Sequence, residues 1–172
     1  MVKFPQIIEE LRIAIIDEEG NTLLDTLIKP EHPIEASFMQ QHGITDEMVK
    51  TAPSFPDIHK KIKVALTNRA VVTYDDNEES LLSRVCRHHD LSSVSVNGSH
   101  GLGHEYAYFW SSLNKEQDAC IRQRLHDACV QQEIIIEEKP GLLANCKMMR
   151  ALILKMANWL TENAEPEMEF DE

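Results

Sequence analysis

Carboxylates that stand close together are the first side chains of this sequence to suggest chemistry. Asp75, Asp76 and Glu78 follow a short apolar stretch, with Glu79 directly after them. Several converging carboxylates can hold hard divalent cations such as Mg²⁺ or Mn²⁺. Acids are also favoured in the first turn of any helix, where they offset the partial positive charge of its end. We therefore interpret this segment as an exposed acidic loop that caps a helix, and keep Asp75, Asp76 and Glu78 as metal-ligand candidates.

A second group of side chains has zinc-binding chemistry and consists of Cys86, His88, His89, His100 and His104. Zinc takes thiolate and imidazole ligands, and its protein sites have characteristic short spacings. The spacing here matches none of them, and His100 and His104 belong to a glycine-rich stretch. We predict that these residues form no zinc site.

Three glycines of that stretch, Gly98, Gly101 and Gly103, superficially suggest a phosphate-binding loop. Such a loop needs a lysine and a Ser or Thr at a fixed distance after the glycines. Neither follows at the required place, so we predict a flexible connection.

A β-hairpin is the clearest element that the sequence predicts. Residues 11–17 and 22–28 are rich in apolar and β-branched side chains, and a turn signal with Gly20 separates them. Further strands are predicted at 70–74 and, with a weaker pattern, at 91–96. Helices are predicted from apolar spacing and end signals at 33–41, 45 onward, 54–66, 79–87, 104–112, 121–132 and 146–162. This alternation predicts an α/β fold with a mixed sheet.

The charge of the chain bears on its partners. Its 172 residues fit one domain, and it carries 17 basic against 29 acidic residues, a formal net charge of −12. Proteins that bind nucleic acid tightly cluster Lys and Arg against the phosphates, so charge disfavours nucleic-acid binding without excluding it. The four cysteines lack disulfide spacing, which predicts a cytoplasmic protein with buried free thiols. No apolar run is long enough to cross a membrane.

The order of several segments resembles the DEDDh-type 3′–5′ exonucleases, the proofreading exonuclease and RNase T superfamily. Residues 7–30 are similar to the second and third strands of that family. His42-Gly43-Ile44-Thr45, together with Met48-Val49, is similar to the family's HGIT-x-x-MV segment. Residues 52–56 are similar to the start of the helix that follows this segment. The closing helices are similar over 125–157. The resemblance implies a ribonuclease-H-like mixed sheet with flanking helices. It also places His42, Gly43 and Ile44 near the substrate groove, although Gly43 and Ile44 would be needed for folding alone.

Active members of this family hydrolyse the terminal phosphodiester with two metal ions. Their carboxylates come from a DxE pair on the first strand and from one Asp in each of two later motifs, and a His acts as base. Here no acid precedes Ile7, Glu78 stands at the second motif, and Asn145 and Pro140 stand where the last Asp and the base belong. We therefore predict a catalytically inactive domain with no cofactor, or Mg²⁺ or Mn²⁺ if activity remains.

The family's first strand lies at the centre of the sheet, and we predict that it is absent here. That would leave two strand edges unpaired, and unpaired edges invite a partner. The hairpin could close onto the later strand, the amino-terminal residues could substitute, or another chain could insert a strand. The predicted partners are therefore a protein or a second copy of the chain, bound through the exposed sheet.

Two further functions stay open at this point. A partner chain could supply the strand and its carboxylates and so complete a 3′–5′ exonuclease, or the acidic chain could imitate nucleic acid and inhibit a protein that binds it. We assign residues 1–160 to one exonuclease-like domain and 161–172, which hold six acids and no base, to a disordered tail.

Overall fold

A five-stranded mixed sheet forms the centre of the computed structural model, which describes residues 2–8, 11–75, 78–114, 122–135 and 141–163. The strand order is β3-β2-β1-β4-β5. The strands are β1 Val2–Ile8, β2 Arg12–Asp17, β3 Thr22–Leu27, β4 Ala70–Thr73 and β5 Ser99–Gly101. The first three form an antiparallel meander, whereas β4 and β5 run parallel to β1. The predicted α/β mixed sheet is confirmed.

The prediction that the central strand is absent is wrong. The amino-terminal segment itself occupies that place, because β1 pairs with β2 on one side and with β4 on the other. We had assigned Ile7 and Ile8 to the second strand, but they end β1, and β2 begins only at Arg12. Val, Phe and Ile residues favour extended backbone, which allows seven residues to form this strand. No gap is left between β2 and β4 for a strand from another chain.

The predicted hairpin is confirmed within one residue at its ends. Asp17, buried at 7% exposure, closes the turn because its carboxylate accepts hydrogen bonds from the backbone N–H and the side-chain amide of Asn21, at 2.8 and 3.0 Å. Gly20 has a φ of 92°, in the region that glycine adopts without steric cost.

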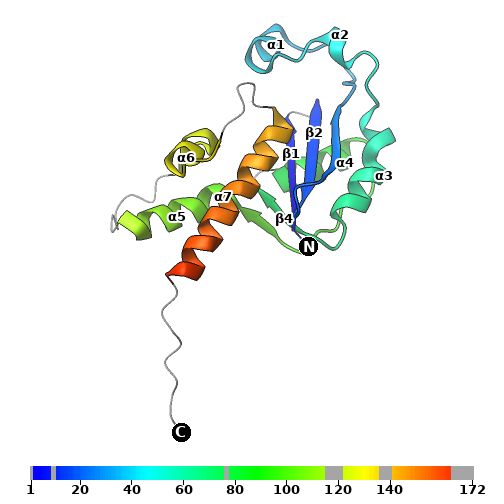
Figure 1. Cartoon of the computed structure of the whole chain (residues 1–172). Helices are drawn as coiled ribbons and strands as arrows, with labels where there is room; N and C mark the ends of the chain where they lie inside the picture. The colour runs from blue at the N-terminus through cyan, green and yellow to red at the C-terminus, as the bar shows by residue number, and fades with distance from the viewer. Residues whose placement is uncertain (1, 9–10, 76–77, 115–121, 136–140, 164–172) are drawn as a thin grey trace.

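Helices cover both faces of the sheet (Figure 1). They are α1 Ala36–His42, α2 Asp46–Val49, α3 Phe55–Leu66, α4 Glu78–His88, α5 Leu102–Asn114, α6 Leu125–Gln131 and α7 Leu142–Glu162. Each lies close to a predicted helix. The longest, α7, crosses one face with α5 and α6 on its far side, whereas α3 and α4 lie on the other face.

Alternate residues of β2 separate two apolar cores, as the two-residue period of a strand requires. Ala14 and Ile16 pack with α5 and α7, whereas Ile13 and Ile15 pack with α3 and α4. All four are 0% exposed, so β2 is buried on both faces. A smaller cluster that includes Ile44 lies under α1 and α2.

The sequence predicted the wrong strand after α4. Residues 91–96 form no strand; Leu91, Val94 and Val96 pack their side chains against the α3–α4 core instead. The glycine-rich residues that we predicted to be a flexible connection contain β5, in which Ser99, His100 and Gly101 pair with β4. Pairing with a buried neighbour strand therefore decides the conformation here, not the local glycine content.

Several smaller predictions concern the ends and the thiols. Cys86, Cys129 and Cys146 are buried free thiols as predicted, and Cys120 lies outside the described residues. The last helix continues through Glu162, past the predicted end of the domain, and the predicted disorder at 164–172 lies outside the described residues. Among the described helices, none combines the length and the apolar character that a membrane span requires.

Candidate functional site

A cavity of about 430 Å³ opens where β4 ends and α7 begins. Its lining consists of Tyr74, Asp75, Arg122, Gln123, Arg124, Leu125 and Asn145. The chain brings these residues together because β4 delivers Tyr74 and Asp75 to the sheet edge, while Asn145 lies in the first turns of α7. We call this the β4–α7 cavity. Of the metal-ligand candidates, Asp75 lines it; Asp76 and the side chain of Glu78 lie outside the described residues.

Asp75 does not stand free in this cavity. Its carboxylate forms an ion pair with the guanidinium of Arg122, and the two side chains are 52% and 37% exposed. Thr73, only 1% exposed, holds the backbone at this point because its hydroxyl donates a hydrogen bond to the carbonyl of Asp75 at 2.6 Å. The carboxylate of Asp75 therefore already has a side-chain cation as its partner.

Tyr74 forms the floor of the cavity. It is 7% exposed, and its hydroxyl donates a hydrogen bond to the carbonyl of Gln123 at 2.7 Å. Burial raises the pKa of Tyr74 to about 12, so the hydroxyl is a donor at neutral pH. The side-chain oxygen of Gln123 is buried without a hydrogen-bond partner in the described structure.

Gly103 lets α5 approach this cavity closely. Its N–H donates a hydrogen bond to the carbonyl of Tyr74 at 3.0 Å. A Cβ at this position would lie 2.9 Å from that carbonyl oxygen and 2.9 Å from Nε of Arg122. The glycine that we assigned to a flexible connection is therefore required by tight packing.

His42, Gly43 and Ile44 lie at a second cavity, of about 470 Å³. As predicted, Gly43 ends α1 with a φ of 68°, and Ile44 is buried at 5% exposure. The ring of His42 packs on that of Phe38, with centroids 4.2 Å apart. These roles are structural, and the predicted role in substrate binding stays a prediction.

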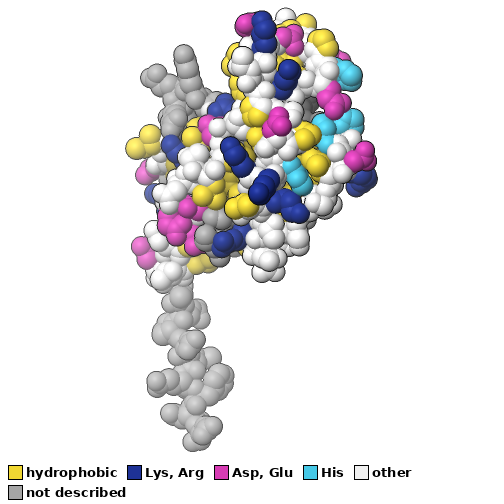
Figure 2. Space-filling view, turned by 90° about the vertical axis from the view of Figure 1, so that its right-hand side faces the viewer, with side chains coloured by type: hydrophobic (Ala, Val, Ile, Leu, Met, Phe, Trp, Pro, Cys, Tyr) yellow, Lys and Arg dark blue, Asp and Glu magenta, His cyan; other side chains and the backbone are white. Residues whose placement is uncertain are grey.

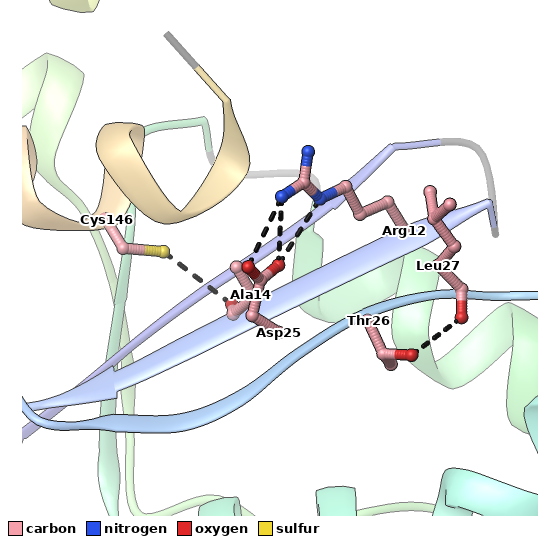
Figure 3. A network of polar contacts seen from close by, with 6 residues as sticks. All are labelled: Arg12, Ala14, Asp25, Thr26, Leu27 and Cys146. Carbon is pink, nitrogen blue, oxygen red and sulfur yellow. Dashed lines mark hydrogen bonds and ion pairs between the residues drawn. The ribbon is translucent and has the colours of Figure 1, made fainter. Parts of the chain in front are cut away.

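An ion pair between neighbouring strands borders this second cavity (Figure 3). Arg12 on β2 donates to both carboxylate oxygens of Asp25 on β3, at 3.1 and 3.3 Å from Nη2. Arg12 also lies against the start of α7, since a Cβ on Gly141 would be 3.2 Å from Nη1. The thiol of Cys146 contacts the carbonyl of Ala14 at 3.7 Å, which seats the same helix on β2.

A third cluster joins residues that are far apart in the sequence. Glu31, in the loop after β3, lies beside His88 and His89 at the end of α4. Cys86 is buried in the α3–α4 core instead, and His100 lies on β5. The structure therefore does not gather the five Cys and His residues into one cluster, and it places Glu31 beside His88 and His89.

Comparison with known proteins identifies the family of the chain. The model of the RNase T exonuclease family matches residues 3–92. The chain belongs to this exonuclease family. A protein called "Uncharacterized exonuclease CP81", from Escherichia phage 186, is 29% identical to this chain in an alignment of 169 positions. The alignment covers 87% of this chain and 80% of that protein.

Solved structures similar to this exonuclease-family chain share its fold. One is exonuclease X in complex with 5′ overhanging duplex DNA, with a TM-score of 0.63, 18% identity and coverage of 96% of this chain and 95% of that one. Another is a 3′-exonuclease that recognises the 3′ end of a histone mRNA stem-loop, with a TM-score of 0.66, 13% identity and coverage of 91% and 81%. The predicted ribonuclease-H-like fold is confirmed.

The described part of the β4–α7 cavity does not fit the two divalent metal ions that this exonuclease family uses. Such ions need several converging carboxylates. The described lining offers one, that of Asp75, and a guanidinium already pairs with it. Asn145 contributes only a neutral amide, and Arg124, which pairs with Asp127, offers no metal ligand. Pro140, at the family's base position, lies outside the described residues.

The two arginines that line this cavity, Arg122 and Arg124, were not identified from the sequence. Arg122 and Arg124 stand two residues apart in an acidic chain, and that local charge was the available signal. Glu31 was missed for a different reason. It is 57 residues from His88 in the sequence, and only the fold brings the two together.

Proposed function

We propose that this chain is an exonuclease-family domain that does not hydrolyse nucleic acid and acts through binding, in the first place to protein. The ion pair of Asp75 with Arg122 carries the proposal. A guanidinium keeps its positive charge at every physiological pH. It therefore competes permanently with any divalent cation for the same carboxylate, and metal ions would have to displace it to bind.

The neutral side chain of Asn145 supports the same proposal. It lines the cavity from α7, where the family's last motif has an Asp. An amide oxygen can coordinate a metal, but it supplies no charge to offset the repulsion between two cations. The loss of a carboxylate and the presence of a paired arginine act in the same direction.

The net charge of −12 supports a protein partner rather than nucleic acid. The alternative of an exonuclease completed by a partner chain required an open position at the centre of the sheet. Strand β1 fills that position, so this alternative loses its structural basis. Imitation of nucleic acid by the acidic side chains stays a prediction, because we describe no acidic surface that supports it.

The test is a nuclease assay on the purified full chain. Single-stranded DNA and RNA with labelled 5′ ends are incubated with Mg²⁺ or Mn²⁺, beside Asp75→Asn and Glu78→Ala variants purified in the same way. We expect no shortening above the level of the variants, which measures contaminating nuclease. Stepwise 3′–5′ shortening by the wild-type chain that disappears in either variant would overturn the proposal.

A further inference from the structure

The cluster of Glu31, His88 and His89 lies away from the β4–α7 cavity, on the face that α3 and α4 cover. Figure 2 looks onto α3, and histidine side chains gather beside it next to acidic ones. One potential ligand atom from each of the three residues lies within 4.8 Å of the other two. The fold therefore brings three potential metal ligands close together.

Two of the separations match those of ligands around one metal ion. Nε2 of His88 is 3.2 Å from one carboxylate oxygen of Glu31, and Nδ1 of His89 is 3.4 Å from the other. Tetrahedral zinc has bonds of about 2.0–2.2 Å, which puts neighbouring ligand atoms about 3.3 Å apart. Small side-chain movements suffice to bring all three atoms onto one ion.

The surroundings hold two of these side chains in place. The ring of His89 stacks on Phe55, with centroids 5.4 Å apart and planes at 15°, and its side chain is only 13% exposed. His88 meets His89 edge to face, with centroids 5.0 Å apart. A cation binds better where its ligands are already ordered, because less conformational entropy is lost.

The backbone on both sides is fixed as well. The loop that carries Glu31 is tied down where Ile28 donates to the carbonyl of Leu11 and Lys29 donates to the carbonyl of Pro53, both at 2.8 Å. At the end of α4, the N–H of Leu91 donates to the carbonyl of Cys86 at 2.8 Å. Glu31 and the two histidines therefore project from two anchored segments.

A hollow of about 210 Å³ adjoins the cluster and gives a ligand room. Its walls are mainly apolar, with Leu11, Ile28, Pro30 and Phe55 among them. His32 lines the same hollow but is not among the three residues whose potential ligand atoms lie within 4.8 Å of one another. The hollow leaves room for a water molecule at a fourth coordination position.

We propose that Glu31, His88 and His89 form a binding site for one divalent transition-metal ion of the zinc class. Two imidazoles and a carboxylate suit Zn²⁺, Co²⁺, Ni²⁺ or Cu²⁺, whereas Mg²⁺ and Mn²⁺ prefer oxygen ligands throughout. The site is separate from the metal position of the exonuclease family and does not depend on the absence of hydrolysis. A bound ion would join the loop after β3 to the end of α4.

Metal binding by the purified, tag-free and chelator-treated full chain tests the site directly. We expect Co²⁺ to bind with a stoichiometry of one and to develop the visible absorption of a low-coordinate complex, and Zn²⁺ to displace it. We expect His88→Ala, His89→Ala and Glu31→Gln each to weaken Co²⁺ binding at least tenfold. His126→Ala is the matched control, because His126 is an exposed histidine on α6 beside Asp127, and it should leave the affinity unchanged.

Thermal unfolding separates loss of a ligand from loss of the fold. Zn²⁺ should raise the Tm of the wild-type chain and of His126→Ala, because it binds the folded state only. The Tm of the three site variants should not respond to Zn²⁺, although each should unfold cooperatively without metal. The proposal would be overturned if the wild-type chain bound no Co²⁺ at a one-to-one ratio, or if His88→Ala and His89→Ala bound Co²⁺ with the affinity of the wild-type chain.

Discussion

Asp75 and Glu31 are carboxylates of nearly equal exposure on opposite faces of one sheet, 52% and 54%. Their neighbours differ in kind. Asp75 pairs with a guanidinium, which has no lone pair to give to a metal, whereas imidazoles flank Glu31 and coordinate metals when they are neutral. The comparison teaches that the partner of a carboxylate, more than its burial, decides whether it can help to hold a cation.

The largest expected effect comes from removing a core leucine under each region. Leu82 on α4 and Leu152 on α7 are 6% and 0% exposed. Replacing either by Ala should lower the free energy of unfolding by about 2–5 kcal/mol, because both leave a cavity. Urea unfolding followed by circular dichroism measures this loss.

The same two variants should differ in metal binding. Leu82 anchors the helix that ends at His88, so Leu82→Ala should weaken Co²⁺ binding severalfold, whereas Leu152→Ala should not. An equal change in both variants would show that the two regions are not independent.

A smaller effect is expected from the titration of Tyr74. Its folded-state pKa of about 12 lies above the value of about 10 in an unfolded chain. Stability from this group is therefore complete below pH 10 and is lost as the pH rises toward 12, by roughly 2 kcal/mol. Unfolding free energies measured across this range should fall less steeply for Tyr74→Phe than for the wild-type chain.

Tyr108→Phe is the control for that titration, because Tyr108 is 66% exposed. Its stability should follow the wild-type pH dependence. Equal slopes for Tyr74→Phe and wild type would contradict the buried, hydrogen-bonded tyrosine beneath the β4–α7 cavity.

The smallest effect is expected from a double variant that makes the β4–α7 cavity a better site for a metal ion. Asn145→Asp combined with Arg122→Ala should raise the Mn²⁺ affinity of the β4–α7 cavity about tenfold, or about 1.4 kcal/mol. The pair removes the fixed cation beside Asp75 and adds a second carboxylate. Asn145→Asp alone should raise the Mn²⁺ affinity only a little. If it raised the affinity as much as the double variant does, Arg122 would not obstruct metal binding. Mn²⁺ titration by calorimetry provides the measurement.

The sequence predicted the elements whose signals are local. The β2–β3 hairpin has alternating apolar residues and a glycine turn, and α3 has apolar residues at helical spacing after Ser54. The sequence failed where pairing decides the structure. The first strand was predicted to be absent and Ser99–Gly101 to belong to a flexible connection, yet Val2–Ile8 and Ser99–Gly101 each pair with β4.

The candidate sites divide in the same way. Asp75 was identified as one of several neighbouring carboxylates and Asn145 by its place in a family motif, and both line one cavity. Arg122, which forms an ion pair with Asp75, comes from a segment between helices that carries no motif. Glu31 and His88 meet only because the loop after β3 and the end of α4 are neighbours in the fold. Contacts between distant segments of this kind have no signature in a single sequence.

The pairing of β1 has a consequence for how the molecule opens. Six residues of β1, from Lys3 to Ile8, are in register with β2, whereas only Val2 and Lys3 are in register with β4. Pro5, which has no N–H to donate, comes two residues after the end of that short contact. The sheet thus consists of a locally connected meander and a parallel pair, joined along a short seam. Amide protons of β2 and β3 should exchange with solvent as one cooperative unit, and those of β4 and β5 as another.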